Sequence, residues 1–259
     1  NAFIGSGSFD SILISAYSNI VGGLSNKIGS SSYATIAGGR NNSIGVTNLG
    51  TYSFIAGGSH NVVNSQRSVS LGSYTNTNSN NGCFIFGDNS TTTATNNTVA
   101  NQFMVRAAGG TIFYTNAGLT SGVQLASGGG AWATVSDKNK KENFETIEGE
   151  TVLSKISNME IKAWNYIAQG ANIRHLGPTA QDFYTAFELG ESDTTITTVD
   201  IDGINLLAIQ TLEKRTKELQ VQNEQFAKLL AIQTKEMEVL KKMLKQSVGD
   251  LKELAKKEK

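Results

Sequence analysis

The sequence predicts a mixed fold in three parts: a β-solenoid built from repeats, a charged and partly aromatic middle region, and a C-terminal coiled coil. Three observations support this prediction. Short β-type runs recur with paired glycines through the first half, the composition changes abruptly near residue 136, and apolar residues follow a heptad period from residue 209. Each part therefore has its own source of stability.

Charge is distributed very unevenly along the 259 residues. Of the 22 basic and 22 acidic residues, only four Lys/Arg and two Asp/Glu lie in residues 1–135, whereas 21 of the 27 glycines lie there. The formal net charge is zero, which argues against a nucleic-acid partner, because such a partner requires a basic surface. No stretch approaches the roughly 20 apolar residues of a membrane span, so we expect no membrane partner.

The residues that commonly bind metals are few. The single cysteine, Cys83, excludes an intrachain disulfide and a Cys-based metal site. It lies in an apolar run, which favours a small buried side chain. The two histidines, His60 and His175, fall in different parts of the chain. We therefore expect no metal and no other cofactor.

Three segments that begin at Tyr17, Tyr33 and Tyr52 share one pattern. Each has a β-type run, a Gly-Gly pair, an Asn three residues later and then another apolar residue, and the second glycines are 16 and 19 residues apart. Weaker copies continue to Asn89. Gly and Asn tolerate the left-handed backbone that tight corners need. One unit cannot bury its apolar face but stacked units can, so the repeats predict a solenoid over residues 1–95.

This pattern resembles the head repeats of trimeric autotransporter adhesins over roughly residues 1–90. The resemblance implies left-handed parallel β-rolls from three chains around one axis, in which the other two chains complete the inner strand faces of each. The family's usual Ala-Ile-Gly core stands here as Ile-Ala-Gly-Gly. A disordered Gly/Ser/Asn linker is the alternative, and the in-phase recurrence of β-branched and aromatic residues argues against it.

Residues 96–135 read as a different β segment that connects the repeats to the middle region. Phe103–Arg106 and Thr111–Tyr114 have the composition of strands, and residues 123–125 suggest a third, shorter one. The polar stretch Thr91–Asn97 before them reads as a loop.

Ser136 and Lys141 lie where the composition changes. A serine hydroxyl is a poor nucleophile until a base takes its proton. Lysine can be that base only when its amine is neutral, which burial or nearby cations such as Lys138 and Lys140 favour. On composition alone, a solvated basic turn explains these residues equally simply, because a Ser and a Lys five residues apart are common.

The neighbouring residues favour the chemical interpretation. Ser136, Asp137, Lys141 and Asn143 match the signature S-D-x-x-x-K-x-N. The segment resembles the intramolecular chaperone, auto-processing domain at the C-termini of phage endosialidases and tail fibres, the peptidase S74 group.

Two downstream motifs extend this resemblance over about residues 123–215. They are Trp164-Asn165-Tyr166 and the run from Arg174-His175-Leu176-Gly177 to Gln181-Asp182. The resemblance implies an α+β chaperone domain over residues 136–208. It also implies that His175 packs or forms hydrogen bonds within that domain rather than acting in catalysis.

The S74 resemblance implies specific chemistry at the junction. Ser136 would be the nucleophile, Lys141 its general base, and Val135–Ser136 the scissile bond. Asp137 and Asn143 would shape the turn or polarise the carbonyl group. The reaction would be a single, self-directed cleavage, so the chain would be an autocatalytic serine endopeptidase with no external substrate.

Seven heptads run from Ile209 to the C-terminus. Ten of the fourteen a and d positions are apolar, with Lys and Glu between them, which predicts a coiled coil over residues 209–259. Asn223 at an a position can fix the register. The residues leave the number of strands open, and three follows from the resemblances. The Lys-rich end from Lys252 is expected to fray; interspersed acids argue against DNA binding there.

Together these features predict part of a homotrimeric extracellular fibre, at a cell surface or on a phage virion. Its partners would be its own copies and a host or prey surface glycan. The alternative is a structural or adhesive trimer that keeps its chaperone attached. A glycan-degrading site in the repeats is disfavoured, because Asp10 and Asp88 are the only acids before residue 136 and glycosidases usually need two placed carboxylates.

Overall fold

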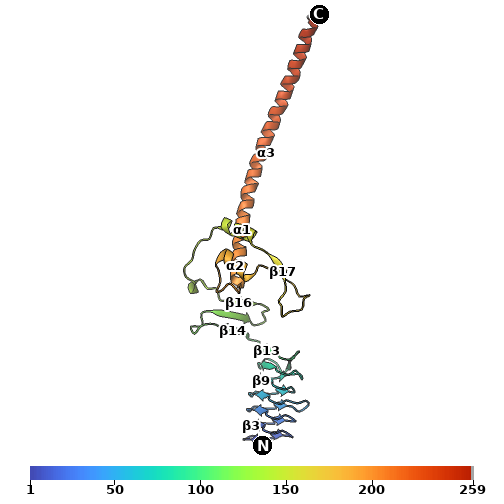
Figure 1. The fold of residues 1–259 in the computed structure, drawn as a ribbon, viewed down its shortest axis with the longest axis vertical. Coiled ribbons are helices and arrows are strands. Elements are labelled where there is room, and N and C mark those ends of the chain that lie inside the picture. The colour runs from blue at the N-terminus through green and yellow to red at the C-terminus, as the bar shows by residue number, and fades with distance from the viewer. Residues whose placement is uncertain (258–259) are drawn as a thin grey trace. The chain divides into compact units, whose positions relative to one another are not determined.

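The structure is a computed structural model that describes residues 1–257. The last two residues of the predicted coiled-coil segment, 258 and 259, lie outside the described residues. The chain forms two units, Asn1–Lys141 and the part from Glu142 onward, and Figure 1 shows their elements in chain order. The predicted division into four segments stays a prediction, and the boundary between the two units falls between Lys141 and Glu142.

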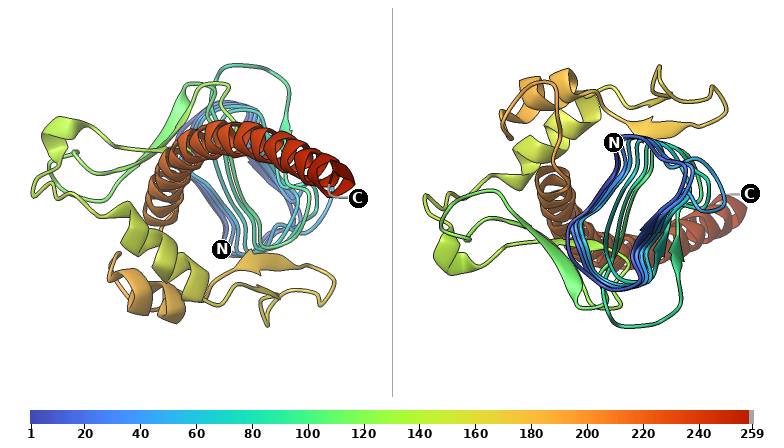
Figure 2. Two further views of the ribbon diagram at one scale, coloured as in Figure 1. Left: turned by 90° about the horizontal axis from the view of Figure 1, so that it is seen from above. Right: turned by 90° about the horizontal axis from the view of Figure 1, so that it is seen from below.

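The first unit begins with a parallel β-solenoid of about six turns, in which each turn gives one strand to each of two sheets. The odd-numbered sheet contains β1 (Phe3–Ile4), β3 (Asn19–Ile20), β5 (Thr35–Ile36), β7 (Phe54–Ile55), β9 (Val69–Gly72), β11 (Phe84–Gly87) and β13 (Phe103–Arg106). The even-numbered sheet contains β2 (Ser11–Ile12), β4 (Lys27–Ile28), β6 (Ser43–Ile44), β8 (Val62–Val63), β10 (Thr75–Asn76) and β12 (Thr95–Asn96). Seen end-on, successive turns overlie one another (Figure 2). The predicted solenoid is confirmed.

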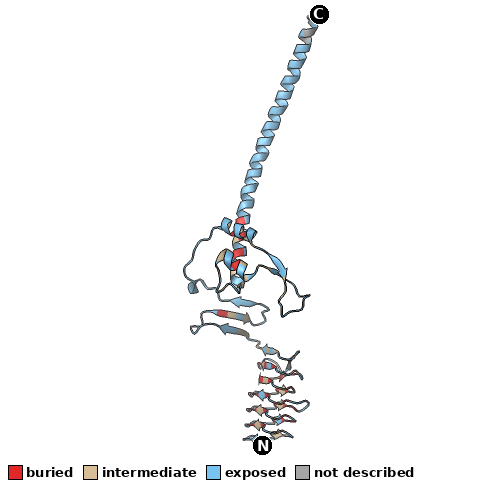
Figure 3. Cartoon of the chain, in the orientation of Figure 1, coloured by how far each residue is buried: buried red, intermediate tan, exposed pale blue. Residues whose placement is uncertain are grey.

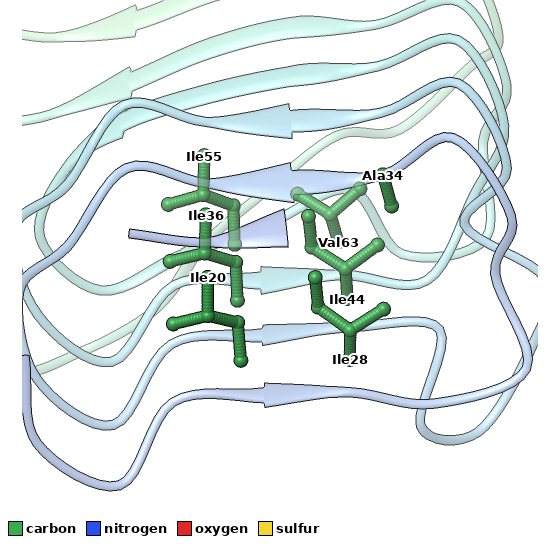
Figure 4. Close-up of a cluster of buried hydrophobic side chains, with 7 residues drawn as sticks. All are labelled: Ile20, Ile28, Ala34, Ile36, Ile44, Ile55 and Val63. Atoms are coloured by element: carbon green, nitrogen blue, oxygen red, sulfur yellow. The ribbon is translucent and has the colours of Figure 1, made fainter. Parts of the chain in front are cut away.

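Two columns of aliphatic side chains fill the space between the sheets (Figure 4). In the odd sheet Ile20 pairs with Ile36, which in turn pairs with Ile55. The even sheet aligns Ile28, Ile44 and Val63 in the same way. All of these side chains are fully buried, and burial of each contributes about 1.5–3 kcal/mol. A two-residue strand is sufficient because one of its residues points inward and the other outward.

A ladder of buried asparagines links successive turns. The Asn42 amide donates to the carbonyls of Gly38 and Gly58, both at 3.1 Å, and its Oδ1 accepts from the Asn61 backbone N–H at 3.1 Å. Asn26 makes the equivalent bonds one turn earlier. These asparagines therefore satisfy backbone groups inside the solenoid, where polar groups without partners are costly.

The corners agree only in part with the sequence prediction. Repeated glycines such as Gly39 (φ 89°) and Gly58 (φ 88°) have positive φ, as expected, but the repeated asparagines do not. Other left-handed positions are filled by residues such as Tyr33 (φ 57°) and Asn41 (φ 55°). The Tyr33 ring stacks on Tyr17 at 5.1 Å and on Tyr52 at 5.2 Å. Stacking in this column compensates for a backbone conformation that costs roughly 1–2 kcal/mol for a non-glycine residue.

The solenoid extends further than the repeats predict. Strand β12 lies in the stretch expected to be a loop, and β13 pairs in register with β11, so the odd sheet continues to Arg106. Arg106 holds this end together: its Nε contacts Asp88 Oδ1 at 3.0 Å, and its other nitrogens donate to the carbonyls of Ser73, Asp88 and Thr93. One side chain thus satisfies several of the groups exposed where the solenoid ends.

A three-stranded antiparallel sheet completes the first unit. It contains β14 (Gly110–Tyr114), β15 (Gly122–Ala126) and β16 (Trp132–Thr134), in that order. A short 3₁₀ helix, η1 (Lys138–Lys140), follows β16. The strands expected in residues 111–114 and 123–125 are confirmed.

The second unit has an α+β arrangement, as the S74 resemblance implies. Its elements are α1 (Gly149–Asn158), β17 (Lys162–Trp164), β18 (His175–Gly177), α2 (Ala180–Phe187) and α3 (Thr198–Lys257). Val152, Phe183, Ile204 and Ala208 form its buried core. The core therefore joins α1 and α2 to the first turns of α3.

Helix α3 is 60 residues long, and only its beginning is packed. From Leu212 onward every described side chain is exposed, as the pale helix in Figure 3 shows. Seen end-on in Figure 2, the helix follows an arc. The continuous helix is confirmed, whereas the coiled coil and the trimer stay predictions. None of the described helices is long and apolar enough to span a membrane.

Candidate junction site

The residues before the predicted cleavage point are held by a sheet. Strand β16 ends at Thr134, and the next residue, Val135, donates its N–H to the Gly122 carbonyl of β15 at 3.2 Å. Val135 therefore prolongs the strand pairing by one residue. The peptide bond to Ser136 begins where that pairing ends.

The residues after that bond form a tight turn. The Asp137 carboxylate caps η1 by accepting the Asn139 backbone N–H at 2.9 Å and the Asn139 side-chain amide at 3.1 Å. An Asp at this position is a favoured cap because its oxygen satisfies a helix N–H that has no other partner. The turn closes when the Lys141 N–H donates to the Lys138 carbonyl at 3.2 Å.

This turn brings Lys141 back to Ser136. The Lys141 Nζ donates to Ser136 Oγ at 2.7 Å, so the two residues proposed as base and nucleophile are in direct contact. The distance is within hydrogen-bond reach, which is the first geometric requirement for a general base. In catalysis the direction of this hydrogen bond must reverse: Ser136 Oγ must donate its proton to a neutral Lys141 amine.

The two supporting residues have different placements. Asp137 shapes the turn through its cap, which is one of the roles implied for it. Asn143 lies in the second unit, where its backbone is left-handed with φ 54°. The catalytic and supporting roles of these residues stay predictions.

Solvent surrounds the junction in the single chain. Every residue from Ser136 to Lys141 is exposed. A lysine that acts as a base usually depends on burial or on neighbouring cations to favour its neutral form. The chain by itself therefore supplies the Ser–Lys contact without the dry surroundings that such chemistry requires.

Histidine His175 has a packing role, as expected. Its Nε2 lies 2.8 Å from Gln169 Oε1, and its ring packs against Trp164 and Tyr166 at centroid distances of 4.9 and 5.4 Å. The neighbouring Arg174 donates to the Ala163 carbonyl at 2.6 Å. These contacts join β17 to β18 and explain why the aromatic and Arg-His motifs occur together.

One residue that positions the junction was not predicted. Gly122 accepts the Val135 N–H only because β15 and β16 pair with a particular register, Val123 opposite Thr134. The Gly-rich linker between the strands hides that register in the sequence. The usable signal was the short alternating segment at residues 123–125, in which Val123 and Leu125 flank Gln124.

Comparison with known families identifies one segment of the chain. Residues 136–189 match the family model of the chaperone of endosialidase, peptidase S74. The match begins at the serine of the Ser136–Lys141 contact, and a β-solenoid precedes it, in agreement with the tail-fibre architecture expected from the sequence. No curated protein sequence matches the chain significantly.

Proposed function

We propose that this chain is part of a homotrimeric fibre that folds with the help of its own C-terminal region. We propose further that the chain then cuts itself at Val135–Ser136. Both proposals start from the endosialidase-type chaperone segment at residues 136–189. The family match supports a chaperone role in tail-fibre folding. The observation that carries the cleavage proposal is the 2.7 Å contact between Lys141 Nζ and Ser136 Oγ.

The reaction begins with an attack by Ser136 Oγ on the carbonyl carbon of Val135. A C–O bond forms, Lys141 takes the hydroxyl proton, and the C–N bond breaks as that proton passes to the Ser136 nitrogen. Water then hydrolyses the ester and leaves a carboxylate on Val135. The second step needs only water, so no cofactor is involved.

The backbone on both sides of the scissile bond is held in place. The acyl side is anchored by the Val135–Gly122 bond, and the leaving side starts a capped turn. A bond between a fixed strand and a turn is held in one orientation, which lowers the entropic part of the barrier. Cleavage there would leave Val135 with the fibre and Ser136 with the chaperone.

Trimer formation is supported by apolar surface that one chain leaves uncovered. Along α3, seam residues such as Phe226, Leu230 and Leu240 are 68%, 64% and 61% exposed. On the odd sheet of the solenoid, Phe84 and Phe103 stack at 5.0 Å on the outer face. Large exposed apolar surfaces on a single chain indicate association, and the heptad seam fits parallel copies of the same helix.

Cleavage would make folding hard to reverse, because a chain that has lost its chaperone cannot use it to refold. The fibre would work outside the cell, on a phage virion or a cell surface, with a host or prey surface glycan as partner. The exposed Asn, Ser and Thr side chains of the solenoid are consistent with carbohydrate contact. Binding of the assembled protein on a glycan array tests this part.

The experiment compares four chains on a denaturing gel after expression: the native chain, Ser136→Ala, Lys141→Met and Lys140→Met. Lys140 is the matched control, because it is an exposed lysine of the same turn and Lys141 is the one that contacts Ser136. We expect two fragments from the native chain and from Lys140→Met, and one intact chain from the other two variants. An intact native chain, or cleavage that survives Ser136→Ala, contradicts the proposal.

A second candidate is a trimer that retains its chaperone. The exposure of Ser136 and Lys141 favours it, because a lysine that acts as a base usually depends on burial or on neighbouring cations. In that case the native chain stays intact at every stage of assembly. Mass measurement of the assembled native protein separates the two candidates, since only the first yields trimers that have lost residues 136–259.

A further inference from the structure

We infer that one face of the β14–β15–β16 sheet is the surface through which copies of this chain meet next to the junction. The face carries Phe113, Val123, Leu125 and Trp132, and its occupant is the same face of the other copies. This inference deepens the proposed function, because it rests on the homotrimer and assigns a contact surface to it.

The strand register places these four side chains together. Phe113 lies opposite Val123, and Leu125 lies opposite Trp132, and alternate residues of a strand point to the same face. The rings of Phe113 and Trp132 lie 5.7 Å apart at an angle of 44°. Thr111 and Thr134 lie on the same face, on the two outer strands, whereas the other face has Gln124 on its central strand between Ile112 and Ala133.

Within the first unit, the two aromatic side chains of this face are exposed, whereas Val123 and Leu125 are half-buried. Phe113 is 53% exposed and Trp132 is 54% exposed. A small sheet needs a second layer against its apolar face to be stable. Two exposed aromatic rings on a three-stranded sheet therefore indicate that a further layer comes from outside this unit.

The absence of charge favours another copy as that layer. Residues 107–135 contain no charged side chain at all. Interfaces with unrelated proteins use charge to select the right partner, and exposed edge strands of monomers are usually protected by Lys or Pro. Neither device is present in β14 or β16. An uncharged apolar face that points to a threefold axis can pack against the equivalent faces of the other two copies without like-charge repulsion.

The position of the face links assembly to the junction. Val135 follows β16 directly and bonds to β15. Packing of this sheet against its copies would fix the acyl side of each scissile bond relative to the trimer. The same packing would hold the new C-termini together after cleavage.

The first test uses tryptophan fluorescence. The chain has two tryptophans, so Trp164→Phe leaves Trp132 as the only one. Acrylamide quenching is measured on this chain with Ser136→Ala added, so that it stays full-length, while light scattering gives its mass. We expect a trimer in which Trp132 is quenched several-fold less than free indole. A trimer in which Trp132 is as accessible as free indole overturns the assigned contact face and leaves the homotrimer standing. A monomer overturns the contact face and the homotrimer alike.

The second test leaves both tryptophans in place. Phe113→Glu and Ile112→Glu are a matched pair, because these neighbours are 53% and 52% exposed and lie on opposite faces of β14. We expect Phe113→Glu to lower the trimer fraction at least tenfold and Ile112→Glu to leave it unchanged. Equal behaviour of the two variants, or the reverse order, contradicts the assigned face. If the native chain is also monomeric, the proposed homotrimer is contradicted as well.

Discussion

Replacement of Asn42 by alanine tests whether the buried asparagine ladder holds the solenoid together. Asn42 is 1% exposed and makes three side-chain hydrogen bonds at 3.1 Å, to Gly38, Gly58 and Asn61. Each bond contributes about 1 kcal/mol net, so their loss lowers the free energy of unfolding by about 3 kcal/mol per chain. The loss is larger if water cannot reach the groups left without partners.

The assay is urea denaturation of the full chain, followed by circular dichroism in the β region. Asn96→Ala is the control, because Asn96 is an exposed strand residue whose amide donates to the nearby Ala94 carbonyl. We expect a clear drop in the unfolding midpoint for Asn42→Ala and a change below about 0.5 kcal/mol for Asn96→Ala, which is typical of surface positions. Equal small losses for the two variants would refute the role assigned to the ladder.

Three further changes have defined outcomes. Asp10 occupies the ladder position below Asn26, and its buried Oδ2 has no hydrogen-bond partner among residues 1–257. Asp10→Asn replaces that oxygen with an amide donor and should raise the free energy of unfolding by about 1 kcal/mol; an unchanged or lower urea midpoint argues against this. The Ser90 hydroxyl, the Ala108 N–H and Arg106 hold the pKa of Asp88 below its ordinary value of 3.8, so its contribution is present above that pH and is lost as the solution becomes more acidic. Asp88→Asn should therefore flatten the fall in stability below pH 4, and an unchanged acid titration contradicts the assignment. Phe183→Ala, in the core of the second unit, should cost about 3–5 kcal/mol and reduce the yield of assembled protein, which gel filtration measures.

The solenoid could be predicted because its core repeats in sequence. Ile20, Ile36 and Ile55 recur with the spacing of one turn, and that periodicity is visible without a structure. The end of the solenoid was missed because Phe103–Arg106 lacks the Gly-Gly signal, although it pairs in register with Phe84–Gly87. The Asp88–Arg106 contact could not be foreseen, because it joins residues 18 apart through a register that only the fold defines.

The role of the repeated asparagines was also outside the reach of the sequence. Asn is compatible with a left-handed corner and with a buried ladder alike, and the local sequence favours the corner. The ladder is selected by the stacking of turns, which places the carbonyl of Gly58 within reach of Asn42. A long-range contact of this kind overrides the local preference of the residue.

At the junction, the spacing of Ser136 and Lys141 became informative only through the surrounding signature with Asp137 and Asn143. The cap on η1 and the 2.7 Å contact agree with that spacing. Helix α3 starts at Thr198, eleven residues before the predicted coiled coil at 209. The signal that was missed is the Thr197–Asp200 capping pair, whose side chains bond at 2.7 Å.

The most direct measurement of the central claim is the mass of the N-terminal fragment from the expressed native chain. Self-cleavage by Ser136 predicts a species that ends at Val135 with a free carboxylate, together with one that begins at Ser136, and neither species from Ser136→Ala. A single mass for residues 1–259, or a fragment that ends at any other residue, would contradict the account.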